Sequence, residues 1–266
     1  MHNSNMNTTV VITGSTRGIG FGLARCFLER GCNVVLNGRS SESIRKATEQ
    51  LQGYGGRVAA VSGDISSREA SIRLYDEAVS HFGRVDIWIN NAGIGHEMCS
   101  TWEVDHHELS QVLRVNIDGV VSATIIAFLR MKEQGGGKIF NMEGLGSDGF
   151  MLNGQTLYGT TKRALTYFTR SFAQEARGTS VQIGTISPGM VVTDMLRRTV
   201  SDASAESQKK KQFFNVMADE VGTVASFLTQ KMVATTAQSP KIKWLTKQRM
   251  IGKILLAPFR KRNFFA

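Results

Sequence analysis

The sequence has few of the residues that mark disulfide-rich, metal-binding or membrane-spanning proteins. Its three cysteines, Cys26, Cys32 and Cys99, are odd in number and scattered, so neither a disulfide framework nor a metal site is expected. The first nine residues are polar, without the apolar segment of a signal peptide, and no run approaches the roughly 18 apolar residues of a membrane span. Only three prolines occur, and 41% of the 266 residues are hydrophobic. This composition predicts a globular, cytoplasmic protein that is at most peripheral to a membrane.

The end of the chain lacks acidic residues altogether. Eight lysines and arginines follow Pro240 and carry most of the net charge of +10, which leaves +2 for the remainder: Lys241, Lys243, Lys247, Arg249, Lys253, Arg260, Lys261 and Arg262. Apolar and aromatic residues alternate with them, a mixture that suits a surface on anionic lipid, where each cation contributes about 1 kcal/mol. A solvated basic face is the alternative. No recognition motif favours a nucleic-acid partner.

A glycine-rich turn follows the first predicted strand. Residues 8–13 form a short β-branched run, Gly14, Gly18 and Gly20 come next, and residues 21–31 form a helical pattern. Backbone N–H groups and the helix dipole at such a turn can bind a pyrophosphate. The spacing differs from G-x-G-x-x-G, so the position between strand and helix is the more informative feature. A purely structural turn is the alternative.

The second predicted strand, residues 33–37, ends where NAD-binding proteins carry an acidic residue that holds the ribose 2′-hydroxyl. Gly38 stands at this point, Arg39 follows it, and Arg17 lies within the glycine-rich turn. Two guanidinium groups without a carboxylate favour a 2′-phosphate, and hence NADP. The alternative is a pair of solvated arginines.

Strand and helix patterns continue to alternate along the chain. Further strands are expected at 57–63, 85–89, 137–142 and 180–187, and helices at 41–54, 67–82, 106–134 and 156–178. About seven strands separated by helices predict an α/β fold with one doubly wound parallel sheet. Residues 1–200 would form its core, and 201–266 a substrate lid and basic extension packed on the same domain.

Two residues of the helix predicted at 156–178 have a chemical use together. Tyr158 and Lys162 are four residues apart and therefore share one helix face. An ammonium one turn away would lower the pKa of the phenol from about 10 and let it exchange a proton near neutral pH. Ser147, in the preceding loop, could hold a carbonyl oxygen beside the phenol. The alternative is a surface pair on an ordinary amphipathic helix.

These motifs together resemble the short-chain dehydrogenase/reductase family. The motifs are Thr13-Gly14-x-x-x-Gly18-x-Gly20, Asn90-Asn91-Ala92-Gly93, Asn116, Tyr158-x-x-x-Lys162 and Pro188-Gly189. The resemblance implies a Rossmann fold, an NADP(H) cofactor, hydride transfer at a carbonyl, and a homo-oligomer. It makes Tyr158 the proton donor, Lys162 its partner and ribose ligand, and Asn116 the holder of a water.

The resemblance also implies a set of cofactor-binding residues. Asp64 would contact the adenine and Thr193 the carboxamide. The full set is Gly14, Ser15, Thr16, Arg17, Gly18, Ile19, Gly20, Arg39, Asp64, Ile65, Asn91, Ala92, Gly93, Tyr158, Lys162, Pro188, Gly189 and Thr193.

The catalytic serine departs from the family pattern. The family's position, 13 residues before Tyr158, is Leu145, counting from the strand gives Gly144, and Ser147 is the nearest serine. The stretch 139–149, like 187–195, 213–218 and the tail, resembles the chlorophyll b reductase branch of the family. That branch implies NADPH-dependent reduction of the C7 formyl group of chlorophyll b. The alternatives are reduction of another bulky aldehyde or ketone (steroid, acyl or polyketide) and a non-catalytic NADP-binding sensor.

Overall fold

The computed structural model describes residues 7–200, 205–260 and 262–265. Within them, seven parallel strands form one sheet in the order β3-β2-β1-β4-β5-β6-β7. The strands are β1 (Thr9–Ile12), β2 (Asn33–Gly38), β3 (Val58–Ser62), β4 (Ile87–Asn90), β5 (Gly137–Met142), β6 (Val181–Ser187) and β7 (Lys241–Lys243). The order reverses between β1 and β4, and ligands bind beyond the carboxyl ends of the strands at such a reversal. The doubly wound parallel sheet predicted from the sequence is confirmed.

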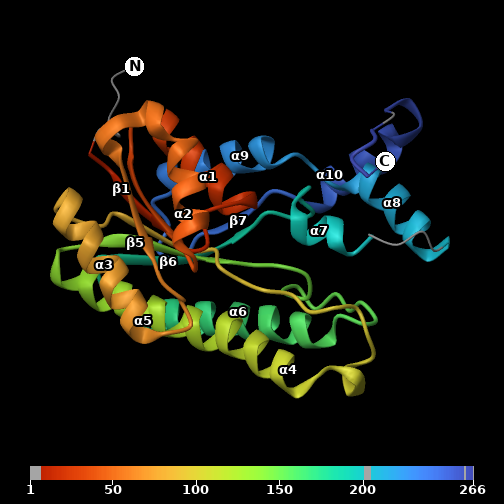
Figure 1. Cartoon of the computed structure of the whole chain (residues 1–266), viewed down its shortest axis with the longest axis horizontal. Helices are drawn as coiled ribbons and strands as arrows, with labels where there is room; N and C mark the ends of the chain where they lie inside the picture. Colours follow the sequence, from red (N-terminus) through yellow and green to blue (C-terminus); the bar gives the residue numbers. More distant parts are fainter. Residues whose placement is uncertain (1–6, 201–204, 261, 266) are drawn as a thin grey trace.

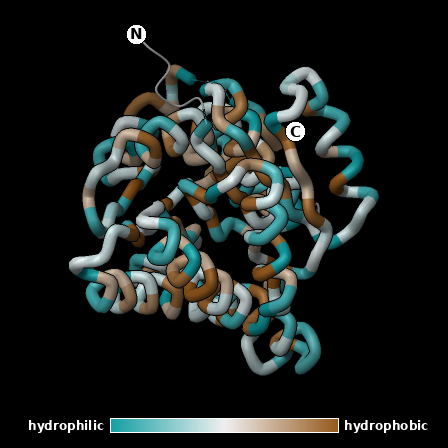
Figure 2. Tube along the Cα trace, turned by 90° about the vertical axis from the view of Figure 1, so that its left-hand side faces the viewer, coloured by the Kyte–Doolittle hydropathy of each residue, from teal (hydrophilic) through white to brown (hydrophobic). Residues whose placement is uncertain are grey.

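Helices cover both faces of the sheet (Figure 1). On one face α1 (Gly18–Glu29) packs closely against α9 (Val221–Ala234), and side chains such as Val10 and Ile12 point towards them. Side chains at the alternate positions of the strands, such as Val11 and Ile139, point to the other face. The helices of that face are α3 (Arg68–Phe82), α5 (Val120–Glu133) and α6 (Thr156–Glu175). Apolar residues therefore gather towards the middle of the molecule (Figure 2).

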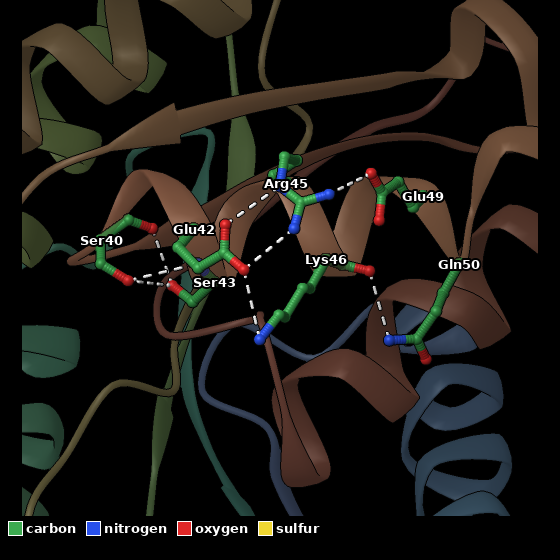
Figure 3. A network of polar contacts seen from close by, with 7 residues as sticks. All are labelled: Ser40, Glu42, Ser43, Arg45, Lys46, Glu49 and Gln50. Carbon is green, nitrogen blue, oxygen red and sulfur yellow. Dashed lines mark hydrogen bonds and ion pairs between the residues drawn. The ribbon is translucent and has the colours of Figure 1, made fainter.

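The helix predicted at 41–54 is shorter in the structure. The α2 helix spans Ser41–Glu49, and a 3₁₀ turn follows at Gln52–Arg57, where Gly55 has a φ of 59°. Ser40 caps its start by accepting a hydrogen bond from Ser43 N. Arg45 then links Glu42 to Glu49 along the exposed side (Figure 3). Such exposed ion pairs add little stability to the helix.

The predicted helical stretch 106–134 consists of three pieces. The α4 helix (His106–Leu113) continues through a π-helical turn (Arg114–Gly119) into α5. By length and apolar composition the stretch His106–Glu133 could cross a membrane, and half of its most apolar window is buried inside the protein. Ala123, Ala127 and Met131 lie in the core against the sheet, which is the position of a core helix.

The segment after residue 200 contributes to the sheet as well as to the surface. It contains α8 (Ala205–Met217), α9, β7 and α10 (Lys247–Leu256), after the short α7 (Asp194–Arg198). The strand β7 pairs with β6 and closes one edge of the sheet, so the sheet extends beyond the predicted core of residues 1–200. Six of its seven strands had been located in the sequence; β7 is too short and too lysine-rich to be recognised there.

Candidate active site

The glycine-rich turn lies against the turn after β4. Gly14 and Gly18 have φ values of 61° and 57°, which favour glycine. A Cβ at Gly14 would stand 2.9 Å from Ala92 Cα. The hydroxyl oxygen of Thr13 accepts hydrogen bonds from the backbone N–H groups of Asn91 and Ala92, each at 3.0 Å. The two motifs predicted to bind cofactor are therefore adjacent.

Two predicted cofactor residues hold these turns together through their side chains. Ser15 is fully buried; its hydroxyl donates to Ile12 O at 2.7 Å and accepts from Asn37 N at 3.0 Å. The amide of Asn91 donates to Thr13 O and Gly14 O, both at 2.9 Å. Because these side-chain groups are already bonded, Ser15 and Asn91 would contact a cofactor through their main chain or through side-chain atoms that make none of these bonds.

The end of β2 excludes an acidic side chain. A Cβ at Gly38 would stand 2.5 Å from Thr16 Cγ2, so Thr16 occupies the space of any larger residue there. Arg17 follows Thr16 in the chain and Arg39 follows Gly38, so each arginine is next to one of the two residues in contact. Both arginines are exposed. The site can therefore offer two guanidinium groups without a nearby carboxylate at position 38, as a 2′-phosphate requires.

Asn116 lies in the π-helical turn and is fully buried. Its Oδ1 accepts from Ile94 N at 2.8 Å, and its Nδ2 donates to Ile94 O at 2.8 Å and Thr161 Oγ1 at 3.2 Å. The side chain thus joins the loop after β4 to α6 at Thr161, the residue directly before Lys162. A π turn inside a helix is frequent at functional sites, and here it directs this amide to the loop.

Tyr158 and Lys162 meet the loops after β4 and β5. Lys162 is buried, and its Nζ lies 3.4 Å from Met142 O and 5.6 Å from the centre of the Tyr158 ring. A Cβ at Gly93 would lie 3.4 Å from Lys162 Nζ, and one at Gly144 only 2.7 Å from the Tyr158 hydroxyl oxygen. Two glycines therefore leave room around the phenol and the ammonium.

The electrostatics of this pair correct one expectation. Burial raises the pKa of the Tyr158 phenol to about 12 and lowers the pKa of the Lys162 ammonium to about 8. The sequence predicted a lowered pKa for the phenol, but withdrawal from water raises it. The phenol is therefore held in its protonated form, which is the form that a proton donor needs.

The hydroxyl of Ser147 is taken up by hydrogen bonds to the main chain. Its hydroxyl accepts from Gly144 N at 3.0 Å and lies 3.3 Å from Lys162 O, to which it donates. It is buried, and Arg163 donates to its carbonyl oxygen at 3.1 Å. Here Ser147 fastens the loop after β5 to α6, while Gly144 stands beside the phenol. Its part as the catalytic serine stays a prediction.

Three further predicted residues, Asp64, Ile65 and Thr193, differ in depth. Asp64 is exposed and accepts from Ser66 N at 3.0 Å, whereas Ile65 is buried. Thr193 caps α7, and its Cγ2 would lie 3.5 Å from a Cβ at Gly18. The lid therefore begins directly over the turn.

Ile94, Thr161 and Gly144 are the residues of this site that the motifs did not assign. Ile94 acts through its main chain, for which no residue type is required. The hydroxyl of Thr161 accepts from Asn116 and donates to Tyr158 O at 2.7 Å. Gly144 could be found by counting from the strand, although its contact with the phenol could not. Pro188 is buried next to Gly189, whose φ of 69° is typical of glycine.

The family model described as short chain dehydrogenase matches residues 8–204. The chain belongs to the short-chain dehydrogenase family. This membership, predicted from the motifs, is confirmed, and it places the chain among the oxidoreductases of that family. No metal-binding cluster of His, Cys, Asp or Glu occurs among the described residues.

Relatives at about one third identity carry the names of chlorophyll(ide) b reductases. The chain is 33% identical to the probable chlorophyll(ide) b reductase NYC1, chloroplastic, of Arabidopsis thaliana, over 96% of this chain and 54% of that protein. It is 33% identical to the chlorophyll(ide) b reductase NOL, chloroplastic, of the same organism, over 92% of this chain and 72% of that protein. The chain thus spans about half the length of the first relative.

Solved structures confirm the fold. L-sorbose reductase from Gluconobacter frateurii, complexed with NADPH and L-sorbose, superposes with a TM-score of 0.80 at 22% identity, over 92% of this chain and 97% of that one. Levodione reductase gives a TM-score of 0.82 at 22% identity. At this identity the likeness concerns the fold alone.

Proposed function

We propose that this protein is an NADPH-dependent carbonyl reductase whose substrate is a bulky apolar aldehyde, with the formyl group of chlorophyll(ide) b as the first candidate. The observation that carries the proposal is the pair Tyr158 and Lys162 beside two glycines. The phenol is held protonated, the ammonium is buried one turn away, and no side chain at Gly93 or Gly144 fills the space next to them. The names of the relatives support the substrate.

The residues present fit NADP(H). The turn at Gly14 and Gly18 allows backbone N–H groups to approach a pyrophosphate. Arg17 and Arg39 would pair with the 2′-phosphate, since Thr16 leaves no room for a carboxylate at position 38. Lys162 would hold the nicotinamide ribose. When bound, the cofactor supplies the hydride that the reduction needs.

The chain's own part in the reaction is the proton. As the carbonyl carbon accepts a hydride, the C=O π electrons move onto oxygen, and the Tyr158 O–H bond breaks to give that oxygen its proton. The Lys162 ammonium then faces the phenolate and stabilises it. Asn116, bound to Ile94 on one side and Thr161 on the other, would hold the water through which the phenol regains a proton.

Surface residues near this end of the sheet support a bulky apolar substrate. Phe150, Met151 and Leu152 lie between β5 and α6 and are 61%, 90% and 41% exposed. On the lid, Met195 and Phe213 are 46% and 50% exposed. Large apolar side chains exposed next to a site mark an interaction surface. Gly144, where the family pattern places a serine after the strand, adds room beside the phenol.

Replacing Tyr158 by phenylalanine tests the proposal. Loss of the proton donor should lower turnover of chlorophyllide b with NADPH by roughly 10²-fold or more, while NADPH binding, measured by calorimetry, is largely kept. Tyr167→Phe is the matched control on the same helix, because its ring is 76% exposed. Full turnover in Tyr158→Phe would refute the assignment. If the protein reduces steroid, acyl or polyketide carbonyls but not chlorophyllide b, the proposed substrate is wrong. NADPH binding without turnover of any carbonyl would favour a sensor.

A further inference from the structure

The C-terminal helix α10 exposes its apolar side. Ile251, Ile254 and Leu255 are 58%, 59% and 68% exposed, and Phe259, in the 3₁₀ turn Ala257–Phe259 that continues the helix, is 85% exposed. At helical spacing 251, 254, 255 and 258 fall on one face, and Phe259 extends the strip. In Figure 1 the helix lies with α7 and α8 at the same end of the molecule.

The charged side of the same helix faces the protein. Lys253 Nζ lies 2.6 Å from Asp219 Oδ1, and its side chain is only 13% exposed. Arg249 stacks its guanidinium 3.7 Å over the Trp244 ring and donates to Trp244 O at 3.0 Å. A surface helix of a globular protein has the opposite arrangement, with its apolar side inside. The orientation of α10 is therefore fixed by ion pairing and stacking, not by burial of its apolar side.

A cationic cavity opens beneath this helix. It has a volume of about 350 Å³ and is lined by Arg249, Lys253, Arg260 and Arg262, with Asp219 as the one carboxylate in its lining. Lys253 and Arg262 both pair with Asp219. Four cations against one carboxylate leave an excess of positive charge in the cavity, and, of these described residues, Arg249 and Arg260 have no ion pair with Asp219. Such a site attracts phosphate-type anions.

We propose that α10 lies on an anionic lipid bilayer, with Ile251, Ile254, Leu255 and Phe259 among the acyl chains and a lipid phosphate in the cavity of Arg249 and Arg260. The apolar strip and the excess positive charge lie on opposite sides of one helix, which is the arrangement of helices that lie in the membrane interface. A second copy of the chain would bring two acid-free, basic tails together, and their repulsion disfavours it. The inference is independent of the reaction that the enzyme performs.

Vesicle sedimentation tests this proposal with the whole chain. Vesicles of phosphatidylcholine containing phosphatidylglycerol should bind the protein, and pure phosphatidylcholine vesicles should bind it much less, with binding weakened by salt. The double variant Ile254→Asp, Leu255→Asp should lower binding more than tenfold, because both side chains leave the acyl region. Arg260→Ala should lower it by roughly fivefold, the contribution of one cation.

Val79→Asp is the matched control, since Val79 is a 37% exposed apolar residue on the distant helix α3; its vesicle binding should equal that of the wild type. Circular dichroism shows that each variant is folded. Unchanged vesicle binding in the double variant would overturn the proposal. So would binding of inorganic phosphate without binding to vesicles, which would show a free-anion site. A lipid-free dimer that the double variant dissociates, again without vesicle binding, would show that a second copy covers α10.

Discussion

At the scale of single residues, three glycines decide which groups can meet around the reacting atoms. Gly38 excludes an acidic side chain next to Thr16, Gly93 leaves space beside the Lys162 ammonium, and Gly144 leaves space beside the Tyr158 phenol. The sequence predicted Gly93 through its motif. It could not show the contact of Gly144 with the phenol, because this contact depends on how the loop after β5 folds onto α6.

Gly144→Ala should damage the site without unfolding the protein. The new Cβ would stand 2.7 Å from the Tyr158 hydroxyl oxygen, so the phenol has to move, and a displacement of about 1 Å can cost roughly 100-fold in rate. Gly95→Ala is the control, because no atom lies within 4 Å of its added Cβ. Steady-state kinetics and a thermal melt measure both effects. Equal rates for the two variants would contradict the placement of the phenol.

The pH dependence of reduction should follow Lys162. Burial lowers the pKa of this ammonium to about 8, whereas the pKa of Tyr158 is raised to about 12, so the phenol stays protonated. The rate should be flat below pH 7 and fall with one ionisation near pH 8, as the ammonium loses its proton. Lys162→Arg should retain a residual rate and move the fall above pH 10, because guanidinium stays charged. A fall near pH 8 that persists in Lys162→Arg would assign it to another group.

At the scale of elements, local patterns in the sequence predicted six strands of the sheet and most of the helices that cover it. They failed where a tertiary contact decides the structure. The strand β7 has only three residues, two of them lysines, and forms because β6 offers a free edge. The helix α10 was not located in the sequence, and its apolar strip stays exposed because Asp219 and Trp244 bind its cationic side.

Asp219 fixes the position of the C-terminal segment. Burial alone would raise the pKa of this carboxyl, but hydrogen bonds from Lys253 and Trp244 outweigh burial and hold the pKa below its usual value. Asp219→Asn should therefore lower the free energy of unfolding by about 3 kcal/mol, because Lys253 and Arg262 lose their buried partner. The loss should start to shrink as the pH falls below the ordinary carboxyl pKa of 3.8, and it should vanish below the lowered pKa of the folded state, where the wild-type group takes up its proton.

Urea unfolding at neutral and acid pH measures this effect. Asp76→Asn, whose side chain is 53% exposed and pairs with Arg130, is the control and should cost less than about 1 kcal/mol. A loss for Asp219→Asn no larger than for Asp76→Asn would show that Asp219 does not anchor the segment.

At the scale of the whole molecule, the order of strands brings together motifs that are far apart in the chain. The turns after β1 and β4 touch because β1 and β4 are neighbours in the sheet, and β5 lies next to β4. The alternation of strands and helices was enough to predict this sheet and the edge at which the motifs gather. It was not enough to predict the pKa of Tyr158, because the depth of burial depends on how the loops close over the sheet.

The most direct test of the central claim follows the hydride. The protein is incubated with chlorophyllide b and NADPH that carries deuterium at both C4 positions, and the product is analysed by mass spectrometry. The account predicts a hydroxymethyl group with one deuterium on its carbon, formed with deuterated NADPH in preference to deuterated NADH. A product without deuterium, or no product from any aldehyde although NADPH binds, would contradict it.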